Sequence, residues 1–247
     1  MGEFASRLKR FFRFSPREMF ELAITIIIVA FIFSYDDKQP VFSTAYWVAN
    51  FLKMILIVAI AIILHEVGHK AAALYIGMRA EYQMWPTGLL IGILATFITN
   101  GKWYIVLPGG LLLHHMSVLR IGHFRYGMNY FTQGLLAAAG PLMNLLLATF
   151  FKTLSIFGIF PVFFDLMTFI NLYYAVFTML PLPRLDGLHL FFASRLNYVF
   201  FFGSLVGYIV LYTIHFYSLL FAFVIGGVIW LLFFNYIEKD TVGLPEK

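Results

Sequence analysis

Long apolar segments alternate with short polar stretches along this chain of 247 residues. A helix that crosses a membrane needs about 20 mostly apolar residues, and a hydropathy scan at that length finds six such segments. They cover approximately residues 20–34, 46–75, 131–157, 162–180 (continuing past a break to residue 194), 198–215 and 216–237. The pattern therefore predicts about six transmembrane helices.

The stretch between the second and third segments does not fit a spanning helix. Residues 88–99 are apolar but too few to cross a membrane, and residues 103–113 form a second apolar run bounded by Gly101 and Gly109-Gly110. Short apolar runs flanked by glycine favour strands or re-entrant elements, which survive at membrane depth only where protein or a water-filled cavity shields them. We therefore predict an all-α polytopic membrane protein with a re-entrant or short β element here. A further spanning helix over residues 87–99 is the alternative.

The composition supports a membrane location and limits the chemistry. Hydrophobic residues make up 62% of the chain and charged residues 12%, whereas a soluble domain carries about 25% charged residues. The chain has no cysteine, which excludes disulfide bonds, thiolate metal sites and a cysteine nucleophile. Any bound metal must therefore be held by histidine and carboxylate side chains.

Charged residues are placed asymmetrically about the first apolar segment. Basic residues precede it (Arg7, Lys9, Arg10, Arg13 and Arg17), and Asp36 and Asp37 follow it. The positive-inside rule then places the N-terminus in the cytoplasm, and an even number of spans returns the C-terminus there. Phenylalanines interleaved with the basic residues suit a helix that lies on membrane lipids rather than one that binds nucleic acid. We divide the chain into an amphipathic cytoplasmic N-terminus (1–18), a transmembrane core (19–237) and a cytoplasmic tail (238–247).

Two histidines stand four residues apart inside the second apolar segment, in the sequence His65-Glu66-Val67-Gly68-His69. Residues i and i+4 share one face of a helix, so His65 and His69 can present two imidazoles to one zinc ion. Glu66 lies about 100° around the helix and can reach a water at that metal. Chance would produce roughly 0.006 such matches in a chain of this composition. A pair of core or capping histidines without metal is the alternative interpretation.

The depth of this histidine pair in the bilayer can be estimated from the flanking basic residues. Long basic side chains reach outward to the membrane surface, so Lys53 marks the outer interface, and Lys70 and Arg79 bracket the inner one. At 1.5 Å per residue, His65 lies about 18 Å from Lys53 and about 8 Å from Lys70 along the helix. The site is therefore expected in the cytoplasmic half of the bilayer, with water entering from that side.

A third protein ligand is needed, because a catalytic zinc usually takes three protein ligands and one water. Asp186 stands amid apolar residues in the sequence LPLPRLDG, which covers residues 180–187. The two prolines break the helix, and Gly187 permits an unusual backbone angle beside the carboxylate, so the side chain can be aimed into the interior of the bundle. Alternatively, the stretch is a short loop in which Asp186 caps a helix over residues 187–194.

Three separated motifs together resemble those of site-2 proteases, which are intramembrane zinc metalloproteases. The motifs are HEVGH (65–69), AGPLMN (139–144) and PLPRLDG (181–187), in that order on the second, third and fourth spans; the resemblance covers about residues 51–194. It implies that His65, His69 and Asp186 hold one zinc ion. It also implies that Glu66 acts as general base and acid, and that the substrate is a transmembrane protein or peptide.

Two further positions bear on how substrate is bound. The resemblance implies that Asn144, one turn beyond Gly140-Pro141, points toward the site and binds substrate or the developing oxyanion. A lone asparagine in an apolar helix can instead join helices by hydrogen bonds. Thr178 stands where the family usually has asparagine, three residues before the first proline of the aspartate motif. Threonine lacks the paired donor and acceptor of an amide. We therefore expect this difference from the family to affect contacts with substrate more than binding of the metal.

The predicted function is that of an intramembrane zinc endopeptidase, which cuts peptide bonds within or beside transmembrane segments, as in regulated intramembrane proteolysis. The alternative is a membrane metal-binding or transport protein that uses the same ligands without proteolysis. A pump would need further carboxylates along a path through the membrane. The apolar spans offer few besides Asp186 and Asp165.

Overall fold

The computed structural model describes residues 3–36, 39, 41–115 and 129–239. Over that part of the chain the elements are, in order, α1 (Glu3–Phe11), α2 (Pro16–Ser34), α3 (Thr44–Ile76), β1 (Met78–Met84), α4 (Pro86–Ile98), β2 (Gly109–His115), α5 (Tyr130–Ile156), α6 (Pro161–Thr178), α7 (Asp186–Ala193), α8 (Arg195–Thr213), α9 (Leu219–Phe233) and η1 (Phe234–Glu238). Helices dominate, and the two strands form one small sheet. The predicted class, an all-α polytopic membrane protein, is confirmed.

Five helices in the described part of the chain are long and apolar enough to cross a membrane: α3, α5, α6, α8, and α9 together with η1. They correspond to five of the six predicted spans. The other predicted span is α2, which has 19 residues but carries Arg17, Glu18 and Glu21 near its start. Charged side chains at bilayer depth are costly unless they are paired, and both glutamates contact other parts of the protein.

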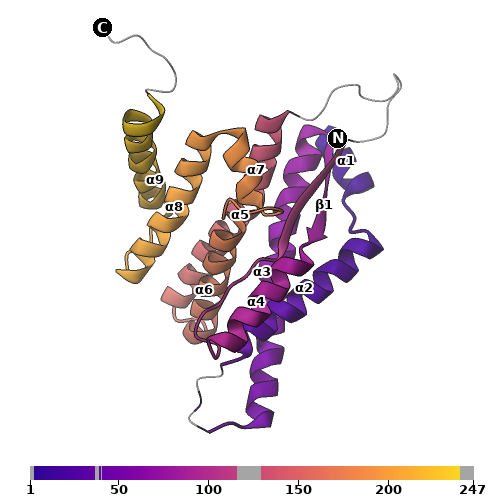
Figure 1. Ribbon diagram of the computed structural model, residues 1–247, viewed down its shortest axis with the longest axis vertical. Helices are drawn as coiled ribbons and strands as arrows, with labels where there is room; N and C mark the ends of the chain where they lie inside the picture. The colour runs from indigo at the N-terminus through magenta and orange to yellow at the C-terminus, as the bar shows by residue number, and fades with distance from the viewer. Residues whose placement is uncertain (1–2, 37–38, 40, 116–128, 240–247) are drawn as a thin grey trace.

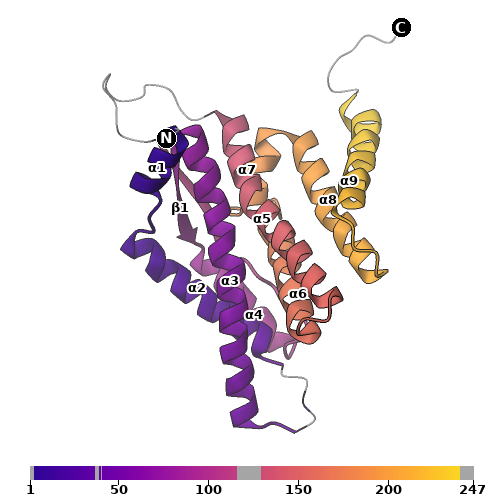
Figure 2. The ribbon, with the colours of Figure 1, turned by 180° about the vertical axis from the view of Figure 1, so that it is seen from behind.

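The helices stand side by side in a row, with α2 and α3 at one end and α8 and α9 at the other (Figure 1). α5, α6 and α7 lie between these pairs, as the view from behind also shows (Figure 2). α3 packs against α2 and α5, and α5 in turn packs against α6 and α7. The region where α3, α5 and α7 meet is therefore surrounded by protein.

The stretch between α3 and α5 contains the predicted short β element. β1 and β2 pair antiparallel, from Met78 opposite His115 to Met84 opposite Gly109. α4 lies between the two strands in sequence and has 13 residues. At 1.5 Å per residue it reaches about 20 Å, which is less than the hydrocarbon thickness of about 30 Å. The structure thus favours the re-entrant interpretation over a further spanning helix at residues 87–99.

The outer edge of β1, opposite β2, is occupied by the two glutamates of α2. Oε1 of Glu18 accepts a hydrogen bond from the backbone N–H of Tyr82 at 2.9 Å, and Oε2 of Glu21 accepts one from the N–H of Met84 at 2.8 Å. An open strand edge inside a membrane would leave such backbone groups unsatisfied. The carboxylates of α2 therefore complete the small sheet and close this edge to another strand.

Lys70 of α3 joins the same network. Its ammonium group pairs with the Glu18 carboxylate at 2.9 Å and donates to the backbone carbonyl of Ala80 at 2.9 Å. The side chains of Lys70 and Glu18 are only 5% and 1% exposed. Lys70 therefore does not extend outward as expected of a lysine at the membrane surface: a carboxylate partner holds it inside the protein, where a lone ammonium would be too costly.

Candidate metal centre

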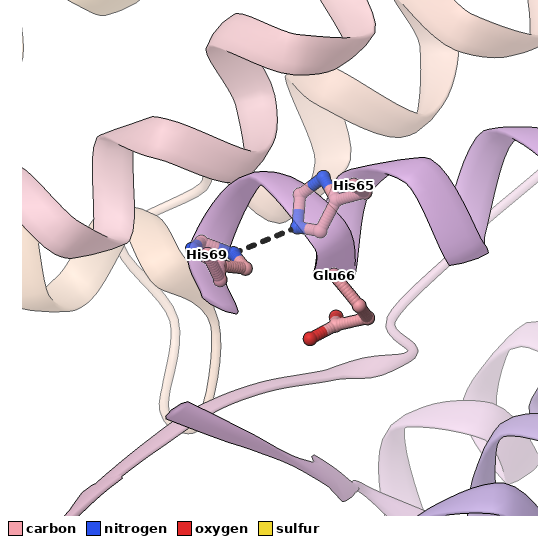
Figure 3. Close-up of side chains that lie close together, drawn as sticks. All are labelled: His65, Glu66 and His69. Carbon is pink, nitrogen blue, oxygen red and sulfur yellow. Dashed lines mark hydrogen bonds between the residues drawn. The ribbon is translucent and has the colours of Figure 1, made fainter. Parts of the chain in front are cut away.

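His65, Glu66 and His69 lie together in the second half of α3. This helix runs for 33 residues without a proline and ends at Gly77, which takes the left-handed conformation with φ 90°. All three side chains are buried, at 2% exposure or less. The imidazoles of His65 and His69 project from one face and Glu66 projects beside them (Figure 3). Their ligand atoms lie within 4.8 Å of one another, so the group could hold a metal ion.

Asp186 reaches this face of α3 because the chain turns sharply after α6. α6 ends at Thr178, and the prolines of the following loop keep it out of a helix. The unusual backbone angle predicted at Gly187 occurs instead at Arg184, with φ 63°. Gly187 lies inside α7, and a Cβ atom there would collide with the carbonyl of Met179. Glycine is thus required for close approach of the two segments, and the expected backbone role of Gly187 is wrong.

The carboxylate of Asp186 does not cap α7. The residue that precedes the helix is Leu185, and no side chain caps the helix start. Asp186 itself is fully buried and lies against the two imidazoles. The alternative in which Asp186 merely caps a helix is therefore not what the structure shows.

Three atoms from three positions form a small triangle: Nε2 of His65, Nε2 of His69 and Oδ2 of Asp186. The two nitrogens are 3.0 Å apart, and the oxygen lies 3.0 Å from His65 and 3.3 Å from His69. Tetrahedral zinc with bonds of about 2.0–2.1 Å separates neighbouring ligand atoms by about 3.3 Å. The triangle is therefore close to the size that a zinc ion requires.

The protonation of the imidazoles also fits a cation. Nδ1 of His65 donates to Oδ1 of Asn144, and Nδ1 of His69 donates to the backbone carbonyl of Leu136. A neutral imidazole carries one proton, so both Nε2 atoms turn lone pairs toward the Asp186 carboxylate. Three lone pairs at this separation repel one another unless a cation lies among them. Oδ1 of Asp186 is also buried without a hydrogen-bond partner.

Asn144 of α5 lies behind His65 and fixes the orientation of its ring. The Asn144 amide nitrogen donates to the backbone carbonyl of Ala61 at 3.1 Å and to Oδ1 of Asn171 at 2.9 Å. With its donors used in this way, the amide must direct its oxygen at His65. Asn144 thus joins α5 to α3 and α6 as well, while its contact with substrate stays a prediction.

The sequence analysis missed Asn171, which holds Asn144 in place. Asn171 is fully buried in α6, and its amide nitrogen donates to the backbone carbonyl of Met167 at 2.8 Å. The signal was available, since Asn171 is a lone amide in an apolar span. Thr178, two turns later, donates instead to the carbonyl of Ala175 in its own helix at 3.1 Å. Asn171 therefore supplies the amide that contacts Asn144, whereas the hydroxyl group of Thr178 is bonded within its own helix.

Replacing Asn144 by leucine is expected to weaken zinc binding about 10- to 100-fold, the usual effect of removing a hydrogen-bond partner of a metal ligand. His65 would lose the acceptor that selects its tautomer. Competition with a fluorescent zinc chelator measures the change. Asn129→Ala, which removes an asparagine from the exposed start of the same helix, is the matched control. Equal zinc affinity of Asn144→Leu and wild type would show that the amide does not position His65.

Gly140 forms the wall of the site on α5. A Cβ atom at this position would run into the Nε2 atoms of His65 and His69, so only glycine leaves the ligand atoms free. α5 continues through Pro141 without interruption from Tyr130 to Ile156. The Gly140-Pro141 pair therefore brings the backbone of α5 close to the face of α3 that carries the two histidines.

Two carboxylates compete for the place of third ligand. Glu66 lies in the same group as the histidines, but it follows His65 on the helix and points to the side of the imidazole face. Asp186 lies within 3.3 Å of both Nε2 atoms. The distances thus favour Asp186 as the third ligand and leave Glu66 beside the cluster.

Comparison with known proteins agrees with a metal-dependent hydrolase. A protein of Methanocaldococcus jannaschii named "Putative zinc metalloprotease" is 33% identical to this chain over 183 residues, which cover 71% of this chain and 84% of that protein. No family model matches the chain, and no solved structure matches it. The identity extends over most of both proteins, and the chain belongs to this family of zinc metalloproteases.

Proposed function

We propose that this protein is an intramembrane zinc endopeptidase of the site-2 protease type, which cuts peptide bonds within or beside transmembrane segments. The observation that carries the proposal is the triangle of His65, His69 and Asp186 with Glu66 beside it. This cluster is buried on a helix long and apolar enough to span a membrane. A peptidase site on such a helix is suited to substrates that are themselves in the membrane.

Each side chain has a definite part in the proposed reaction. His65, His69 and Asp186 hold the zinc ion, and Asn144 keeps His65 in the required tautomer. When bound, zinc polarises the scissile carbonyl and lowers the pKa of the attacking water. Glu66 takes a proton from that water and returns it to the leaving amine. Removal of ordinary solvent by the surrounding helices strengthens these electrostatic effects.

The burial of acidic groups supports hydrolysis over transport. In the described residues, the buried carboxylates are Glu18, Glu66 and Asp186. Glu18 pairs with Lys70, and the other two belong to the metal cluster. Asp165 of α6 pairs with Lys152 at 2.7 Å. These four carboxylates do not form a row of unpaired groups across the membrane, which a path for ion transport would need.

An extended substrate can pair with the small sheet at one of its two edges. The outer edge of β1 is occupied by Glu18 and Glu21. The other edge belongs to β2, where a Cβ atom at Gly110 would collide with the carbonyl of Arg184 and lie 3.4 Å from Oδ1 of Asp186. A substrate strand paired with β2 would therefore lie close to the metal cluster. Strand addition of this kind exposes a peptide bond that a helix would shield.

The proposal is tested by reconstituting the zinc-loaded chain in vesicles with single-span reporter peptides. Each reporter carries a different apolar segment, and mass spectrometry in ¹⁸O-water identifies the new carboxyl end. We expect cleavage inside or within a few residues of the apolar segment, and slower cleavage when the segment is a stable leucine-rich helix. Cleavage confined to soluble peptides, or none in any reporter while zinc is bound, would contradict the proposal.

A further inference from the structure

A cavity lies at the end of α3, and none of the residues of the metal cluster lines it. It has a volume of about 570 Å³ and is enclosed by the N-terminal segment, the last turns of α3 and the start of β1. Basic residues of all three parts line it: Arg10 and Arg13, Lys70, and Arg79. Neither the proposed reaction nor the metal cluster uses this cavity.

The charge of the cavity is strongly positive. Lys70 is neutralised by Glu18, but the part of the chain that the structure describes offers no ion pair to Arg10, Arg13 or Arg79. One acidic side chain, Glu81, also lines the cavity, which leaves an excess of at least two positive charges. Like charges gathered in one place are unfavourable, so the cavity is suited to an anion.

Arg79 carries the most specific feature of this cavity. Its Cζ atom lies over the ring of Phe11, 4.4 Å from the centroid, which is a cation–π contact. Its Nε atom is buried and has no hydrogen-bond partner. A buried donor without an acceptor is costly, and a guanidinium presents its donors in a planar fork that matches phosphate oxygens. Since Arg79 lines the cavity, a phosphate group there can accept hydrogen bonds from its guanidinium.

The cavity lies at the end of α3, a helix long and apolar enough to cross a membrane. The membrane-spanning helix α3 ends at Ile76, and Arg7 of α1 donates to the carbonyls of Leu74 and Tyr75 in its last turn. α1 therefore lies across the end of a span, beside β1 (Figure 1). Its phenylalanines and basic residues suit a helix at the membrane surface. Apolar side chains that also line the cavity, Leu74 and Phe14 among them, can face the lipid glycerol and upper chains.

We propose that this cavity binds the phosphate-bearing headgroup of an anionic phospholipid, with Arg79 and Arg10 as its main contacts. The lipid would tie α1 and β1 to the end of α3. Lys70, which lines the cavity, follows His69 directly in the chain. The lipid would therefore stabilise the part of α3 that carries the metal cluster. The proposal does not depend on peptidase activity.

Native mass spectrometry of the full zinc-loaded chain tests this assignment. The protein is purified in a neutral detergent and titrated with phosphatidylglycerol or phosphatidylcholine. We expect one tightly retained phosphatidylglycerol and no comparable retention of phosphatidylcholine. The double variant Arg10→Gln, Arg79→Gln should bind phosphatidylglycerol at least about tenfold more weakly, since it loses two charge-assisted contacts.

Two further variants separate lipid binding from folding and from general charge. Lys9→Gln removes one positive charge from the exposed surface of α1 outside the cavity, and it should bind lipid as wild type does. Arg79→Lys keeps the positive charge but loses the planar set of guanidinium donors. Its affinity for phosphatidylglycerol should fall between those of wild type and Arg79→Gln. Zinc content and circular dichroism confirm that each variant is folded.

Three results would overturn the assignment. Equal retention of the two lipids would exclude a site for an anionic headgroup. An equal loss in Lys9→Gln and Arg79→Gln would show that only overall surface charge attracts the lipid. Displacement of the lipid by inorganic phosphate at a similar concentration would show a site for free phosphate and contradict the choice of a lipid.

Discussion

Replacing Glu66 with glutamine is expected to stop peptide hydrolysis while the protein keeps about one zinc ion per chain. Glutamine has nearly the same shape but cannot accept and return a proton. Loss of general acid–base catalysis reduces the rate about 10²- to 10⁴-fold. The three atoms of the metal triangle belong to other residues, so zinc binding should not change. Reporter cleavage and metal content, measured on the same preparation, check both parts of this prediction.

Glu238→Gln is the matched control, because Glu238 lies at the far end of the chain and pairs with Arg195. It should cleave the reporter at the wild-type rate. Cleavage by Glu66→Gln at that rate would remove Glu66 from the reaction. Loss of zinc in Glu66→Gln would instead make Glu66 a ligand, and this would contradict the assignment of Asp186 to the metal.

Asp186→Ala is expected to lose both zinc and activity. The change removes the only negative charge among the three ligand atoms and leaves two imidazoles, one ligand fewer than a catalytic zinc normally has. The loss of affinity should exceed the 10- to 100-fold effect expected for a partner of a ligand. After dialysis against a weak chelator, wild type should keep about one zinc and the variant almost none, as measured by mass spectrometry of the metal.

Asp165→Asn provides the control for Asp186→Ala. Asp165 lies in α6 and interacts with Lys152 and Ser155, away from the metal cluster. Its replacement should leave zinc content at the wild-type level. Full zinc retention by Asp186→Ala would show that a different group, most directly Glu66, completes the metal site.

Much of the architecture followed from hydropathy and from one motif. Apolar runs of sufficient length predicted the helices that span the membrane, because each run must satisfy its own backbone inside lipid. The i, i+4 spacing placed His65 and His69 on one face of α3. These are local properties, which a sequence carries without reference to the rest of the fold.

Contacts between distant segments could not be predicted in the same way. The meeting of Asp186 with His65 joins residues 121 apart in the chain and depends on how α3, α5 and α7 pack. The ion pair of Lys70 was not foreseen for a similar reason: its partner Glu18 comes from a helix that a hydropathy pattern treats as an independent span. Asn171 carried a local signal, a lone amide in an apolar helix, but only the packing of α5 on α6 shows that its partner is Asn144.

X-ray absorption at the zinc edge, on the purified wild-type protein, tests most directly whether three side chains from α3 and α7 hold one zinc ion. We predict stoichiometric zinc with four nitrogen or oxygen neighbours at about 2.0–2.1 Å, two of them imidazoles. Zinc present in substoichiometric amounts, or surrounded by six oxygens with fewer than two imidazoles, would contradict the account.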